Sequence, residues 1–276
     1  MAKTAPKLGN RRVTGKEQFY TPRDTAEWVV GKVLKFVDNP DKLTWLEPSA
    51  GSGVFIDVLA EQGISDVLAV DIEPHHKRVK RQDFLAWKAP HAGLVAIGNP
   101  PFGRNNALSI PFFNHCSEFC DVIAFIVPRS WRKWSVTNRL SKDFELKADY
   151  DLHINYVDAT GNDVYAKNNL KTCLQIWKRT SKPRQPVIIP ATELAVKCSP
   201  TDADIAMRVF GYGCGTVYTE FKREPNTTMI FLKVKNRNVI KALKSIDFSK
   251  YYNNVSYTQA LAFSEIRHEL IKYFAR

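Results

Sequence analysis

The sequence has few cysteines, few glycines and no long apolar run, and each of these features excludes a class of protein. Only 5 of its 276 residues are cysteines, and none is arranged as Cys-x-x-Cys or with paired histidines, so neither a disulfide framework nor a zinc site is indicated. Its 13 glycines exclude a collagen-like or linker-dominated chain. No apolar run approaches the roughly 20 residues that cross a bilayer, and the first residues lack an apolar signal core. We therefore expect a soluble, cytoplasmic, globular protein without a metal.

Acidic residues are scarce relative to basic ones. The chain has 40 Lys and Arg against 28 Asp and Glu, a formal net charge of +12. This imbalance favours a polyanionic partner, and nucleic acid fits better than a membrane surface because no segment predicts a strongly basic amphipathic helix. A solvated basic surface is the alternative.

Short apolar runs alternate with helical periods along most of the chain. Thr21 and Pro22 predict the start of a helix that Asn39 and Pro40 end. Short buried strands interleaved with helices predict an open, mostly parallel α/β sheet. The expected strands are 43–46, 67–71, 94–97, 122–127, 153–157 and 173–177, and the expected helices between them are 54–62 and 110–119.

Composition also predicts how the chain is divided. Residues 1–16 mix Lys and Arg with Gly, Pro and Thr and are expected to form a flexible basic arm. Two prolines in the polar run 181–186 predict a boundary between a main domain at 17–180 and a small α+β domain at 181–276. This second domain, with 15 basic and 8 acidic residues, is expected to bind the substrate or target and to end in a helix at 258–274.

A glycine-rich stretch, residues 47–53, follows the first expected strand and precedes a helix. Glycines there let a ligand approach the backbone, although Gly51 and Gly53 match neither the dinucleotide fingerprint nor a phosphate loop, and an ordinary tight turn is the alternative. Asp71, at the end of the next strand, can accept hydrogen bonds from both hydroxyls of a ribose or cap the following turn. Together the two features favour an adenosine-bearing ligand.

The tetrapeptide Asn99-Pro100-Pro101-Phe102 comes directly after the strand expected at 94–97. Two adjacent prolines fix the backbone and remove two donors, which leaves carbonyl groups and the Asn99 side chain as acceptors at the end of the strand. Such acceptors suit an amine. A strand followed by a rigid loop is the alternative.

Together these motifs resemble those of the S-adenosylmethionine-dependent amino-methyltransferases, in particular the N6-adenine DNA methyltransferases, over about residues 17–180. The resemblance implies a Rossmann-like class I methyltransferase fold, S-adenosylmethionine as cofactor and Asn99, Pro100, Pro101 and Phe102 as the catalytic residues. It implies that the cofactor is bound by an N-terminal motif, the glycine-rich loop, the ribose-binding acid with its neighbour, a short motif whose aspartate contacts the adenine amine, and the catalytic asparagine. These residues are Phe19, Tyr20, Thr21, Pro22, Glu47, Pro48, Ser49, Ala50, Gly51, Gly53, Asp71, Ile72, Asp83, Phe84 and Asn99.

The chemistry of adenine agrees with this resemblance. Its exocyclic nitrogen is conjugated with the ring and is a poor nucleophile, so the site must localise the lone pair. Oxygen atoms of Asn99 and Pro100 that each accept one amine hydrogen would do so and would stabilise the developing positive charge. Phe102 would stack on a base that has left its helix, or would fill the core beneath the loop.

Further residues are candidates for binding nucleic acid. Arg129, Trp131, Arg132 and Lys133 interleave aromatic and basic side chains after a strand, where a loop with one buried Trp is the alternative. In the second domain Lys222 and Arg223 would contact the backbone. Residues 211–215 look like a second glycine loop, but their context predicts a β-turn.

The function predicted is methyl transfer to the N6 amine of adenine in DNA, with no obligate protein partner. RNA adenine, a protein glutamine, or no catalysis in a nucleic-acid-binding module are the alternatives.

Overall fold

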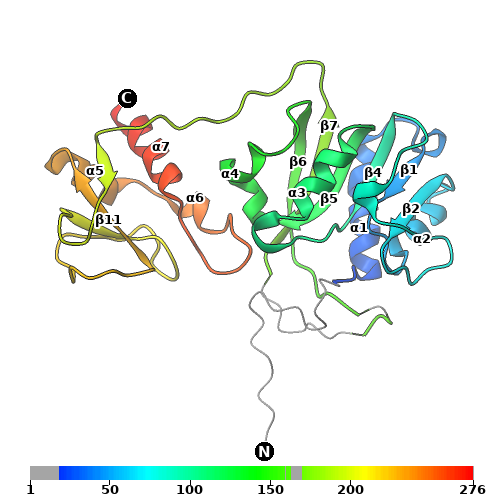
Figure 1. Cartoon of the computed structure of the whole chain (residues 1–276), viewed down its shortest axis with the longest axis horizontal. Helices are drawn as coiled ribbons and strands as arrows, with labels where there is room; N and C mark the ends of the chain where they lie inside the picture. Colours follow the sequence, from blue (N-terminus) through cyan, green and yellow to red (C-terminus); the bar gives the residue numbers. More distant parts are fainter. Residues whose placement is uncertain (1–18, 159, 163–169, 276) are drawn as a thin grey trace, which may run out of the picture. The chain divides into compact units, whose positions relative to one another are not determined.

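The computed structural model describes residues 19–158, 160–162 and 170–275, so the arm expected at 1–16 lies outside the described residues. The chain forms two compact units (Figure 1). The N-terminal unit comprises Met1–Pro128 and Trp134–Pro186, and the C-terminal unit comprises Arg129–Lys133 and Val187–Arg276.

A seven-stranded sheet, in the order β3-β2-β1-β4-β5-β7-β6, forms the N-terminal unit. The first five strands of that order are parallel, and β7 is antiparallel to both β5 and β6. The open, mostly parallel α/β sheet expected from the sequence is confirmed. Its strands are β1 (Trp45–Glu47), β2 (Val67–Asp71), β3 (Lys80–Arg81), β4 (Leu94–Gly98), β5 (Cys120–Pro128), β6 (Phe144–Leu152) and β7 (Thr172–Arg179).

The central strands of this sheet are covered on both faces. Every residue of β4 is buried, and eight of the nine residues of β5 are buried, as their nearly continuous apolar sequences predict. Helix α1 packs against α2, and α3 packs against β5 (Figure 1). The helices of this unit are α1 (Arg23–Val33), α2 (Val54–Glu61), α3 (Ser109–Cys116) and the single turn α4 (Trp134–Thr137).

Several elements of the N-terminal unit differ from the prediction, among them the first helix, which ends at Val33 and not at Asn39 and Pro40. The strand expected at 153–157 is wrong: only Val157 pairs there, in an isolated bridge with Tyr20, and the strand of this region is β6. Most of β6 is exposed or half-buried at the sheet edge, so its sequence has no apolar run to reveal it. The first helix begins at Arg23, because Pro22 has extended backbone angles and is the N-cap residue, without a side-chain hydrogen bond at the cap.

The C-terminal unit is a small α+β structure, as expected. Its sheet is antiparallel, in the order β10-β9-β11-β8. The last helix begins at Phe263, five residues later than predicted. The elements are β8 (Ala195–Lys197), β9 (Ile205–Arg208), β10 (Val217–Tyr218), β11 (Met229–Val234), α5 (Arg237–Ser245), α6 (Ser249–Tyr252) and α7 (Phe263–Phe274).

None of the helices in the described ranges combines the length and the apolar character that crossing a membrane requires.

Candidate functional site

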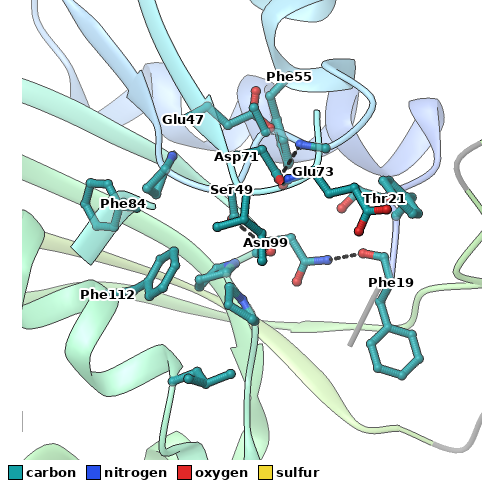
Figure 2. A pocket seen from close by; sticks show the side chains of 18 of the residues that line it. Phe19, Thr21, Glu47, Ser49, Phe55, Asp71, Glu73, Phe84, Asn99 and Phe112 are labelled. Atoms are coloured by element: carbon teal, nitrogen blue, oxygen red, sulfur yellow. Dashed lines mark hydrogen bonds between the residues drawn. The ribbon is translucent and has the colours of Figure 1, made fainter. Parts of the chain in front are cut away.

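A cavity of about 400 Å³ lies where β1, β2 and β4 end, beside the point at which the strand order reverses (Figure 2). Ligands of open α/β sheets bind at such a switch point because loops from neighbouring strands diverge there. The cavity brings together most of the residues that the sequence singled out. Those that line it are Phe19, Tyr20, Thr21, Glu47, Pro48, Ser49, Ala50, Gly51, Asp71, Ile72, Asp83, Phe84, Asn99, Pro100, Pro101 and Phe102.

Asp71 fixes the two loops that border the cavity. Its Oδ2 accepts the Gly51 N–H at 2.8 Å, and its Oδ1 accepts the Glu73 N–H at 2.7 Å. Gly51 has a φ of +46°, and a Cβ there would lie 2.8 Å from Cε1 of Tyr20. The carboxylate therefore orients the glycine-rich loop and caps the turn after β2, which is one of the two interpretations that the sequence left open, and Asp71 also lines the cavity.

Two residues assigned to the cofactor do not line the cavity. Pro22 accepts the N–H of Ala26 through its carbonyl oxygen and so starts α1. Gly53 precedes α2 with a φ of +77°, and a Cβ there would lie 2.5 Å from Cγ of His76. These residues shape the walls of the cavity through the backbone.

Glu47 is a buried carboxyl group at the end of β1, only 2% exposed. Its Oε2 has no hydrogen-bond partner among the described residues, although it belongs to a side chain that lines the cavity. Burial raises the pKa of Glu47 well above its ordinary value, and the negative charges of Asp71 and Asp57 raise it further. Burial and the neighbouring negative charges therefore disfavour the ionised form of this carboxyl group.

Asn99 presents an unused acceptor at the same cavity (Figure 2). Its side-chain Nδ2 donates to the backbone carbonyl oxygen of Phe19 at 3.0 Å. The backbone carbonyl oxygen of Asn99 accepts a hydrogen bond from the hydroxyl of Ser49 at 3.3 Å. The side-chain Oδ1 is buried and has no partner among the described residues. A buried acceptor without a donor costs free energy, so this atom is suited to a donor that a ligand supplies.

An aromatic wall completes the cavity. Phe102 is 7% exposed and lines the cavity, and Phe84 packs against Phe112 of α3 with 5.0 Å between ring centroids. Asp83 turns the chain into this wall by accepting the N–H of Leu85. Sequence reasoning missed part of the lining, because an apolar helix face gives no sign that it faces a ligand rather than the core. The missed residues are Val54, Phe55, Glu73, Leu85, Leu108 and Phe112, whereas Ser52 lies within the glycine-rich stretch 47–53 and Gln82 belongs to the short motif of Asp83.

The residues expected to bind nucleic acid have differing surroundings. Trp131 is fully buried, so its ring is not placed to stack on a base, and the alternative of a loop with one buried Trp describes it. Lys133 is mostly buried, and its Nζ lies 3.8 Å from Oε2 of Glu265 within the C-terminal unit. Arg129 and Arg132, on the same segment, are half-buried.

Lys222 and Arg223, the two candidates for binding nucleic acid that follow β10, also differ in their surroundings. Arg223 donates through Nη1 to three backbone carbonyls, those of Pro200, Thr201 and Ala203, so its guanidinium supports a loop. Lys222 is exposed. Among the described residues no group of three or more His, Cys, Asp or Glu side chains gathers where it could hold a metal ion.

The strand order and the position of the cavity define a Rossmann-like fold of the class I methyltransferase type. The expectation from the motifs is confirmed at this level.

The comparisons with known proteins agree with this class. The chain is 27% identical over 127 residues to the type II methyltransferases M.HincII and M.HindII of Haemophilus influenzae, a match that covers 41% of this chain and 24% of each relative. It thus spans about a quarter of the length of these curated relatives. No family model matches. The chain is similar in sequence to type II methyltransferases, as the motifs predicted.

Two solved structures illustrate the structural similarity. A putative RNA methyltransferase from Pyrococcus horikoshii is 16% identical, with a TM-score of 0.47 over 63% of this chain and 93% of its own. A modification subunit of a putative type I restriction enzyme from Vibrio vulnificus is 14% identical, with a TM-score of 0.45 over 94% of this chain and 62% of its own.

Proposed function

We propose that the protein uses S-adenosylmethionine to methylate the exocyclic N6 amine of adenine in DNA. The observation that carries the proposal is the buried Oδ1 of Asn99 at the cavity, an acceptor for which the described part of the chain supplies no donor. The amine of adenine is such a donor. The similarity to type II methyltransferases and the net charge of +12 support the transfer of a methyl group to a nucleic acid.

The lining of the cavity fits the proposed cofactor. Asp71 can accept hydrogen bonds from ribose hydroxyls through the remaining lone pairs of its carboxylate, and Phe84 and Ile72 offer apolar surface to an adenine ring. The buried Oε2 of Glu47 can face the positively charged methionine part. When bound, the sulfonium supplies an activated methyl group and a neutral leaving group, so the proposed reaction needs no metal.

Asn99 performs the step that the protein must contribute. Its Nδ2 is held by the carbonyl of Phe19, which leaves Oδ1 to accept one hydrogen of the target amine. The carbonyl of Pro100 accepts the second hydrogen, and the nitrogen becomes tetrahedral, with its lone pair free to form the new C–N bond. The same oxygen atoms would stabilise the positive charge that develops on nitrogen as the methyl–sulfur bond breaks and its electron pair stays on sulfur, until the nitrogen loses a proton to solvent.

Phe102 and the C-terminal unit bind the rest of the substrate in this proposal. Phe102 lines the cavity next to Asn99 and stacks on the adenine once the base has flipped out of its helix. The C-terminal unit, which has 16 Lys and Arg against 8 Asp and Glu, supplies contacts to phosphates, with exposed Lys222 among them. Residues 181–276 thus act as the substrate or target-recognition domain.

The test is transfer of a labelled methyl group from S-adenosylmethionine to matched pools of DNA, RNA and protein, followed by digestion to identify the modified unit. N6-methyladenine is expected from DNA. Label in RNA adenine or in glutamine would replace the proposed substrate, and tight cofactor binding without any label would identify a non-catalytic binding module.

Asn99→Ala serves as the diagnostic variant in this assay. It is expected to lose about 100- to 1,000-fold in transfer rate while still binding S-adenosylmethionine, because the lost acceptor acts on the transition state. The control is Asn238→Ala, which removes an exposed amide of α5 and should leave the rate unchanged. An Asn99→Ala variant as active as the wild-type protein would refute the role of Oδ1.

A further inference from the structure

The turn between β9 and β10, residues 211–215, presents one aromatic side chain almost entirely to solvent. Tyr212 is 97% exposed, whereas Cys214, two residues further on, is 5% exposed. Phe210, directly before the turn, is 45% exposed. A ring at such exposure keeps its apolar faces in water and gains free energy when a partner covers them.

The turn holds this position through its backbone. The N–H of Gly211 donates to the carbonyl oxygen of Gln259 at 2.9 Å, and the N–H of Gly215 donates to that of Arg208 at 2.8 Å. Gly215 has a φ of +90°, and a Cβ there would lie 2.4 Å from the hydroxyl oxygen of Tyr252. Glycines and backbone hydrogen bonds hold the conformation of the turn. The turn therefore keeps its conformation without contacts from the ring of Tyr212, and the ring stays exposed to solvent.

A cation lies against the same turn. The Cδ atom of Arg208 lies 3.5 Å from the point at which a Cβ of Gly213 would stand, so the stem of this side chain packs along the turn, and the residue is half-exposed. The C-terminal unit as a whole is strongly basic. An exposed aromatic ring on a turn along which an arginine packs, within a basic unit, fits a polyanion that carries flat apolar groups better than it fits a protein surface.

We propose that Tyr212 stacks on a base of the nucleic acid substrate and that Arg208 contacts a phosphate next to that base. The inference rests on the nucleic acid substrate of the proposed function and assigns a contact surface in the C-terminal unit. Stacking does not read the identity of a base, because every base has an aromatic face. The contact therefore adds affinity and holds the strand, and leaves sequence preference to other groups.

The test is equilibrium binding of the full chain to a fluorescein-labelled DNA duplex and to its separated strands, followed by anisotropy. Tyr212→Ala is expected to weaken binding by about 5- to 100-fold, the effect of losing one stacked base, whereas Tyr212→Phe keeps the ring and most of the affinity. Tyr273→Ala is the matched control, because Tyr273 is an exposed tyrosine of the same unit, and it should bind like the wild-type protein.

Arg208→Gln tests the second contact. Loss of one phosphate contact should lower the slope of log affinity against log salt concentration by about one, at any DNA sequence. An unchanged slope would overturn the role of Arg208.

The outcomes separate this inference from the proposed function. Binding of S-adenosylmethionine should be the same in all these variants, because Tyr212 and Arg208 do not line the cavity. Equal DNA affinity of Tyr212→Ala and the wild-type protein, together with methyl transfer to DNA, would overturn the inference and leave the proposed function standing. Equal losses in Tyr212→Phe and Tyr212→Ala would show a hydroxyl contact and overturn stacking. A wild-type protein that binds S-adenosylmethionine but no nucleic acid would overturn both.

Discussion

Replacing Glu47 with glutamine is expected to change the pH dependence of stability. The folded N-terminal unit buries this carboxyl group next to Asp71 and Asp57, which raises its pKa well above the ordinary value of 4.5. In the unfolded chain the group titrates near that ordinary value. At a pH between the two values the folded state holds a proton that the unfolded chain has released. The contribution of this carboxyl group to the free energy of unfolding is therefore complete below about pH 4.5 and is lost as the pH rises toward the pKa of the folded state.

The magnitude follows from this linkage. Each pH unit between the two pKa values lowers the folding equilibrium constant of the wild-type protein by up to about tenfold through this one group. A glutamine amide has nearly the same shape and does not titrate. As the pH rises above 5 toward the folded-state pKa, Glu47→Gln should therefore gain stability relative to the wild-type protein, by up to about tenfold in this constant for each pH unit.

The assay is urea unfolding at several pH values, read by hydrogen exchange in peptides of β1 and β4 so that the N-terminal unit is followed by itself. Asp38→Asn is the matched control, because it removes an exposed carboxyl group of the same unit. A constant difference between Glu47→Gln and the wild-type protein across this pH range would refute the reasoning, since it would mean that Glu47 is ionised in the folded state.

Three further predictions address other parts of the chain. Gly51→Ala would place a Cβ 2.8 Å from the ring of Tyr20 at a positive φ, so affinity for S-adenosylmethionine in calorimetry should fall at least about tenfold; unchanged affinity would mean that the loop yields freely. Phe102→Ala should raise the KM for nucleic acid more than it lowers kcat in the transfer assay, and the reverse pattern would exclude base stacking. Tyr251→Phe removes a 2.6 Å hydrogen bond to Glu269 and should destabilise the C-terminal unit by about 1–2 kcal/mol in thermal unfolding, whereas an unchanged midpoint would deny that bond a structural role.

Buried apolar strands were the part of the fold that the sequence predicted well. The strand at Val67–Asp71 was expected with its observed bounds. β4 and β5 were expected within a few residues, because both faces of these two strands are covered and their sequences are nearly continuous apolar runs. β6 was missed, because an edge strand with a mostly exposed pattern has no such run.

The candidate site was predictable where backbone geometry demands particular residues. Gly51 and the Asn99 tetrapeptide stand at strand ends, and their residue types show where a ligand can approach. Side-chain direction was not predictable in the same way. Trp131 lies in an alternating aromatic and basic run, yet its side chain is buried. The guanidinium of Arg223 donates hydrogen bonds to three backbone carbonyl oxygens of its own unit. Both outcomes depend on tertiary neighbours that a local pattern does not contain.

The segment Arg129–Lys133 belongs to the C-terminal unit although both of its flanks belong to the N-terminal unit. A gene cut once at the 186/187 junction would therefore yield two incomplete pieces. The shorter piece would keep Glu265, 4% exposed in its side chain, without the Lys133 ammonium that stands 3.8 Å from it. Exchange of C-terminal units between related chains, by recombination or by design, consequently requires a graft at two places, and a chimera that carries the five-residue insert along with residues 187–276 should fold where the simple fusion fails.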